Sequence, residues 1–246
     1  MGIEIGIFNT GELNAITDVK GVQVGHETII QGNNVRTGVT IIKPHAGDIF
    51  NEKVMAAVHV TNGFGKALGF TQISELGTIE TPIALTNTLN VFLVANAIVD
   101  YMISNNSKIK SVNPVVGETN DGGLNDIQGR HVKKKHVLSA IRKAKSGAVK
   151  EGSIGAGTGT RALGFKGGIG TSSRILPKRY GGYTIGVLVQ TNFGGNLVIN
   201  GAPIGRELKK SAFSDAIPYD GEEGSCMIVI ATDAPLSNRN LLRTAK

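Results

Sequence analysis

The apolar stretch at residues 89–103 places the strongest constraint on how this chain can fold. It is interrupted by Asn90, Asn96 and Asp100, and it is shorter than the roughly 20 residues that a helix needs to cross a bilayer. We therefore expect a buried helix. Because such a helix is apolar around most of its circumference, it must be covered on more than one side. This predicts a helical layer enclosed between a sheet and further structure.

The remaining patterns predict strands toward both ends of the chain and helices in the middle. Strands are expected at residues 16–26 (two short strands and a turn), 38–42, 54–60, 183–190 and 226–231. Helices are expected at residues 88–103 and 133–148, followed by a closing helix that begins near Pro235 and Ser237. This order favours an α+β protein over a repeating βαβ protein. We find no repeat or linker and expect a single domain over residues 1–246.

Composition argues against nucleic acid as a partner. The net charge is +7, but aromatic residues make up only 5% of the chain and Trp is absent, so the stacking surface that single strands need is missing. The basic run at residues 130–135 is interpreted as a solvated helix start. The single cysteine, Cys226, excludes an internal disulfide and fits a reducing compartment. With no signal-peptide pattern in the first thirty residues, we expect a cytoplasmic protein that does not bind membranes.

Two familiar binding patterns are incomplete. In the glycine-rich segment at residues 155–159 the third Gly comes one residue too early for the dinucleotide fingerprint, and no Lys-Ser or Lys-Thr follows as a P-loop requires. The five histidines lack metal-ligand spacing, since the closest pair, His131 and His136, is five positions apart. We assign no metal and no cofactor.

The pair Gly224-Ser225 carries the most specific chemistry. It lies between an acidic turn at residues 220–223 and an apolar run. Scission of the bond before Ser225 would leave an α-amine with a pKa near 8, which could deprotonate the neighbouring hydroxyl. Gly224 suits the scissile position because it has no Cβ. The alternative is an ordinary turn that leads into a strand.

Two further polar residues have a chemical and a structural interpretation. Glu118 follows a short apolar strand, where its carboxylate could bind a cationic amine or simply be solvated. Asn192 ends a strongly apolar strand, so that its amide could stabilise an oxyanion or form a turn.

Taken in order, several segments resemble the DmpA-type aminopeptidases. This family, also called the L-aminopeptidase/D-esterases, includes the β-peptidyl aminopeptidases. The matching segments are ITDVKGVQVGH (16–26), RTGVTI (36–41), ETPIALTNT (80–88), NPVVGETNDGGLNDI (113–127), residues 152–174, VLVQTNFG (187–194) and GSCMIVIATDAPL (224–236). The resemblance implies a four-layer αββα sandwich like that of N-terminal-nucleophile hydrolases, and a homo-oligomer, expected to be a tetramer of processed protomers.

The resemblance also assigns roles to residues. It implies autocleavage between Gly224 and Ser225, giving an α chain (residues 1–224) and the start of a β chain (residues 225–246), with Ser225 as nucleophile. It makes Asn192 the oxyanion donor and Glu118 the carboxylate that binds the substrate amine. At Asn120, which is assigned to substrate binding, some relatives carry an aromatic residue that borders the active site.

The family continues well past the position of Lys246, which is only twenty-one residues after Ser225. We expect the additional part to hold β-chain strands, a Ser and a Glu that assist the nucleophile, so that residues 1–246 alone neither mature nor turn over substrate. The expected function is release of N-terminal residues from short peptides, amides or esters through an acyl-enzyme. Two alternatives stay open: an acyltransferase of the ornithine acetyltransferase type, and a catalytically incomplete remnant that acts as a subunit.

Overall fold

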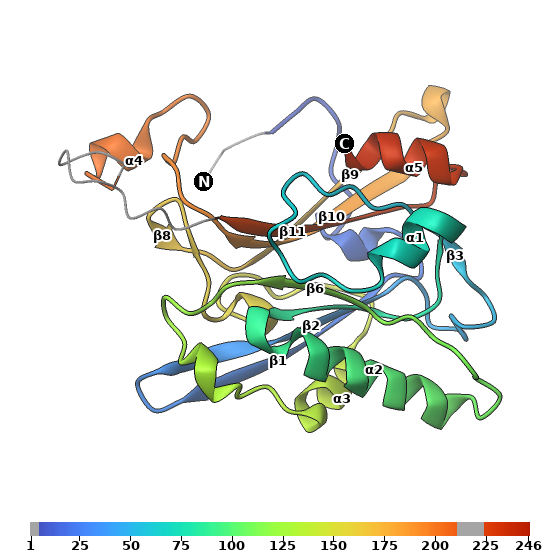
Figure 1. Ribbon diagram of the computed structural model, residues 1–246. Coiled ribbons are helices and arrows are strands. Elements are labelled where there is room, and N and C mark those ends of the chain that lie inside the picture. Colours follow the sequence, from blue (N-terminus) through green and yellow to red (C-terminus); the bar gives the residue numbers. More distant parts are fainter. Residues whose placement is uncertain (1–4, 211–223) are drawn as a thin grey trace.

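Two β-sheets lie face to face in the computed structural model, which describes residues 5–210 and 224–246 (Figure 1). The first sheet has the order β1 (Gln23–Gln31), β2 (Val35–Lys43), β5 (Ile83–Asn87) and β6 (Val115–Thr119). The second has the order β11 (Ser225–Thr232), β10 (Thr184–Asn192) and β9 (Ile169–Ile175). Two short pairs are β3 (Val54–Met55) with β4 (Thr78–Ile79) and β7 (Arg161–Ala162) with β8 (Phe165–Lys166).

Five α-helices are described: α1 (Phe70–Leu76), α2 (Val91–Asn105), α3 (Lys134–Lys143), α4 (Ile204–Glu207) and α5 (Asn238–Ala245). The 3₁₀ turns are η1 (Ile16–Asp18), η2 (Thr88–Asn90), η3 (Ile127–Gly129), η4 (Gly155–Gly157) and η5 (Lys178–Tyr180). Helix α2 connects β5 to β6, the parallel pair of the first sheet; the other pairs in both sheets are antiparallel.

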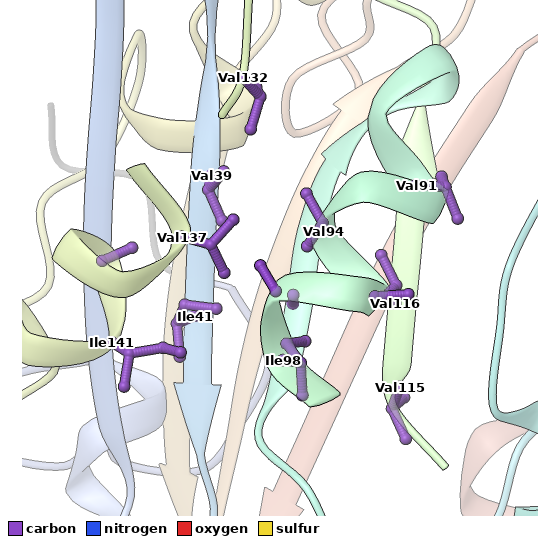
Figure 2. Packing of buried hydrophobic residues seen from close by; sticks show 14 of the residues in the cluster. Val39, Ile41, Val91, Val94, Ile98, Val115, Val116, Val132, Val137 and Ile141 are labelled. Atoms are coloured by element: carbon purple, nitrogen blue, oxygen red, sulfur yellow. The ribbon is translucent and has the colours of Figure 1, made fainter. Parts of the chain in front are cut away.

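The predicted helix is confirmed as α2, but its enclosure on more than one side is not: α2 lies in an outer layer, and Phe92 and Ile103 on its outer face are exposed. Together with α3, helix α2 covers the outer face of the first sheet (Figures 1 and 2). Val39 and Ile41 of β2 lie there beside Val137 and Ile141 of α3, in one buried cluster with Val94 and Ile98 of α2 (Figure 2). Burying an aliphatic side chain of this size contributes about 1.5–3 kcal/mol, so this cluster is a main source of stability.

The opposite face of the first sheet packs on the second sheet. Because strand side chains alternate, Ile42 points away from the helices that Ile41 contacts. It joins a second cluster with Leu85 of β5, Leu188 of β10 and Met227 of β11. The first sheet is therefore buried on both faces, as an inner layer of an αββα sandwich must be.

The outer face of the second sheet is less covered. On β11, Met227 and Val229 are half-buried, whereas Cys226 is exposed and Ile228 is 58% exposed. Helix α5 lies on this side of the sheet in Figure 1. The layer order follows the expected αββα sandwich, with a thinner last layer. Within the described residues β11 pairs only with β10, so its other edge is open.

Three element predictions need correction. Residues 16–26 form a 3₁₀ turn and the start of one strand, because the Asp18 carboxylate accepts backbone N–H groups from Leu13 and Ala15. Helix α3 ends at Lys143, since the next turn is replaced by a backbone pair between Lys145 and Val24. Only the first two residues of the strand expected at 54–60 form a strand.

Candidate active site

The hydroxyl of Ser225 receives two N–H groups. Ser225 is the first residue of β11 and pairs with Asn192, the last residue of β10. The side-chain Nδ2 of Asn192 donates to Ser225 Oγ at 3.3 Å, and the backbone N–H of Asn120 donates to the same oxygen at 3.4 Å. Asn120 follows β6 of the first sheet. The site therefore lies where the ends of the two sheets meet.

The orientation of the Asn192 amide is set by the backbone. Its Oδ1 accepts the N–H of Arg161 at 3.2 Å, which leaves Nδ2 as the group that faces Ser225. Positioned N–H groups of this kind stabilise an oxyanion because they need no reorganisation during the reaction.

Asn120 contacts Ser225 through its backbone and not through its side chain. Its side-chain Oδ1 accepts the N–H of Gly122 at 2.8 Å, a local turn that holds the loop after β6. The next residue, Asp121, is buried, and Asn125 donates to its carboxylate at 2.9 Å. Burial raises the pKa of Asp121, while hydrogen bonds from neighbouring side chains act in the opposite direction. The loop that presents the Asn120 N–H is thus anchored in the protein interior.

Glu118 is buried and lies one position before the end of β6. One carboxylate oxygen accepts the backbone N–H of Lys66 at 3.1 Å, and the other accepts the hydroxyl of Thr88. Neither donor was anticipated from the sequence. With its orientation fixed by two donors, the carboxylate retains further lone pairs for a cationic group.

Gly224 occupies a position where a side chain does not fit. A Cβ added there would lie 2.7 Å from the Cβ of Phe193. Glycine is therefore required before Ser225 on steric grounds, in addition to the accessible carbonyl that it offers. The acidic turn at residues 220–223 lies outside the described residues.

A groove of about 1970 Å³ connects these groups. It contains Ser225, Asn192, Asn120 and Glu118, so the structure brings all of the sequence-predicted side chains to one cavity. Among the other lining residues are Val58, Val60 and Phe64 from the segment after β3, and Ile228 of β11. The residues of the expected strand at 54–60 thus form a wall of the groove.

The glycine-rich segment has a structural role. The N–H groups of Gly155 and Ala156 donate to the hydroxyls of Thr28 and Thr40 at 2.8 and 3.1 Å, so these amides do not face a ligand. Across residues 5–210 and 224–246, no three His, Cys, Asp or Glu side chains gather as a metal ion would require. In the same part of the chain, no helix has the length and apolar character to span a membrane.

Comparisons with known proteins find relatives over most of the chain. The model of peptidase family S58 matches residues 14–246. A β-peptidyl aminopeptidase, BapA of Sphingosinicella xenopeptidilytica, is 43% identical over 257 aligned positions that cover 96% of this chain and 64% of the relative. The chain thus spans less than two thirds of the length of this curated relative.

Solved structures match almost the whole chain. The PH0078 protein of Pyrococcus horikoshii OT3 superposes with a TM-score of 0.91 at 49% identity, covering 99% of this chain and 70% of that one. The L-aminopeptidase D-Ala-esterase/amidase of Ochrobactrum anthropi, described as a variant of the Ntn hydrolase fold, gives 0.85 at 37% identity, covering 97% and 68%.

Proposed function

Because the chain belongs to peptidase family S58, we propose that it forms the nucleophile-bearing part of a self-processing aminopeptidase. The protein releases N-terminal residues from short peptides, amides or esters, with Ser225 as nucleophile and without a cofactor. The observation that carries the proposal is the convergence of the Asn192 and Asn120 N–H groups on Ser225 Oγ, directly after a Gly that admits no side chain.

Processing divides the chain into residues 1–224 and a part that begins at Ser225. Ser225 Oγ attacks the carbonyl carbon of Gly224, the C–N bond between the two residues breaks, and an ester and a free α-amine result. Water then hydrolyses the ester. During the attack the former carbonyl oxygen becomes negatively charged and lies close to Oγ. The N–H groups of Asn192 and Asn120 are within its reach and stabilise this charge.

Turnover uses the same groups. The α-amine of Ser225 accepts the hydroxyl proton, Oγ attacks the substrate carbonyl, and the leaving amine takes up that proton as the acyl-enzyme forms. Water then hydrolyses the ester to Ser225 and releases the acyl group. Because an α-amine has a pKa near 8, activity falls on acidification as the base becomes protonated. A rate that stays flat down to about pH 5 would exclude this base.

We propose that Glu118 binds the ammonium group of the substrate. Its carboxylate is buried in the same groove as Ser225, and its two donors hold it in one orientation. An ion pair with the substrate amine would select substrates with a free N-terminus. One relative is named a β-peptidyl aminopeptidase and another an L-aminopeptidase D-Ala-esterase/amidase, and Asn120 lines the same groove as Glu118.

Further features of the whole protein are part of the proposal. We expect a homo-oligomer, a tetramer of processed protomers, located in the cytoplasm. The apolar outer face of β11 supports association, and the absence of any cysteine besides Cys226 supports a reducing compartment. Light scattering on the purified protein tests the oligomeric state.

Intact-mass spectrometry tests the proposed function on the protein expressed from its whole reading frame. We expect two polypeptides, the second of which begins at Ser225, and p-nitroanilide hydrolysis by the mixture. Ser225→Ala abolishes both, whereas Cys226→Ala, which changes the exposed neighbouring residue, leaves both intact. An unprocessed chain, or processing that survives in Ser225→Ala, contradicts the proposal. Acyl transfer to an added amine in excess of hydrolysis would favour the ornithine acetyltransferase type of activity.

A further inference from the structure

The side chain of Gln190 connects the two sheets beneath the candidate active site. Gln190 lies on β10, the central strand of the second sheet, and is fully buried. Its Nε2 donates to the hydroxyl of Thr119 at 2.7 Å and approaches the carbonyls of Thr86 and Ala156 at 3.1 Å each. These partners belong to β6, β5 and η4. One carboxamide thus links β10 to three separate segments.

The surrounding acceptors fix the orientation of this carboxamide. If it were flipped, Oε1 would face the carbonyl oxygens of Thr86 and Ala156, which cannot donate. In the observed orientation Oε1 is buried without a hydrogen-bond partner. The unsatisfied oxygen costs free energy and offsets part of what the hydrogen bonds of Nε2 contribute. Beyond packing, the Gln190 side chain adds a fixed geometry, because its three acceptors lie at set positions on the facing segments.

The two ends of the link are close in sequence to residues of the site. Gln190 and Asn192 lie two residues apart on the same face of β10. On the other sheet, the Thr119 acceptor stands between Glu118 and Asn120. The nearby contact of Met227 with Gly117 is apolar and uses a flexible side chain, which tolerates sliding of the sheets. A hydrogen bond does not, because it requires separations of about 3 Å.

We propose that Gln190 is a positioning residue. It sets the separation between Ser225 and Asn192 on the second sheet and Glu118 and Asn120 on the first. This inference rests on the proposed function, since the groups that it aligns are the nucleophile, its oxyanion donors and the carboxylate for the substrate amine.

The test compares two buried positions on the same face of β10 in the protein expressed from its whole reading frame. Gln190→Met keeps the length of the side chain and removes its donors. Leu188→Ala, the matched control, weakens the same inter-sheet core two residues farther from the site. We expect Gln190→Met to lower kcat at least about tenfold with KM nearly unchanged. The substrate amine still binds Glu118, but the substrate carbonyl is misaligned with Ser225 Oγ. Leu188→Ala should lower the urea midpoint and leave kcat of the folded fraction unchanged.

A crystal structure of Gln190→Met gives a readout that does not need activity. We expect the separation of Asn120 N and Ser225 Oγ, 3.4 Å in the unsubstituted chain, to exceed the hydrogen-bond range. Unchanged kcat together with an unchanged separation would overturn the inference. If the unsubstituted protein neither processes nor hydrolyses, the proposed function fails, and the separation alone decides the role of Gln190. Should Gln190→Met not fold, Thr119→Val removes the nearest acceptor and is put through the same comparison.

Discussion

Replacing His26 with Gln should reduce the loss of stability that this protein undergoes on acidification. His26 lies on β1 with Nδ1 at 2.9 Å from Thr40 Oγ1, and its Nε2 is buried without a partner. Both ring nitrogens of a charged imidazole are donors, so protonation would place an uncompensated N–H in the interior. Burial, and secondarily the charge of Lys150, lowers the pKa of His26 to about 4.

The sign and size follow from proton linkage. The pKa of His26 is 6.5 in the unfolded chain and about 4 in the folded chain. Because the folded pKa is lowered, the neutral side chain contributes full stability above pH 6.5, and this contribution declines as the pH falls toward 4. The decline amounts to at most about 2 kcal/mol at pH 5 and about 3 kcal/mol at pH 4.

Urea unfolding of the two proteins at pH 7.5, 6 and 5 measures this difference. Asp18, Glu27 and Glu80 also have lowered pKa values, as does His136, but they are present in both proteins and largely cancel. We expect the unsubstituted protein to lose more stability between pH 7.5 and 5 than His26→Gln. Parallel pH profiles, or an NMR titration of folded His26 with a midpoint near 6.5, would refute the reasoning.

Three further predictions concern the site. Asn192→Ala should lower kcat about 10²- to 10³-fold with little change in the melting temperature, since one oxyanion donor is lost; a smaller effect on kcat contradicts that role. Gly224→Ala should slow processing, followed by intact mass, because its Cβ would lie 2.7 Å from Phe193 Cβ, and Phe193→Gly in the same chain, which removes that Cβ, should restore part of the rate. Glu118→Gln should raise KM for substrates with a free amine more than for N-acylated esters, and equal changes would exclude an ion pair.

The sequence predicts those parts of the site that depend on strand ends. Ser225 and Asn192 stand at the start and the end of apolar runs, and adjacent antiparallel strands bring such ends together. The sequence predicts that Glu118 follows its strand, whereas it lies within β6 and lines the same groove.

Other parts could not be predicted because they depend on the backbone or on distant partners. The N–H of Asn120 faces Ser225 whatever its side chain is, so residue type carries no signal. Thr88 and Lys66 reach Glu118 from 30 and 52 positions away. Gln190 had a detectable signal, since it is a polar residue that follows Gly186 and Leu188 on the buried face of its strand, two positions before Asn192.

The pairing of β10 with β11 has a consequence for the ends that scission would create. Chain ends usually fray, because few contacts hold the terminal residues. A cut before Ser225 would make the first residue of a paired strand a terminus, already aligned through the register that runs from Asn192–Ser225 to Ile185–Thr232. The new amine would therefore emerge in a fixed place, and little conformational entropy would remain to be lost before it acts.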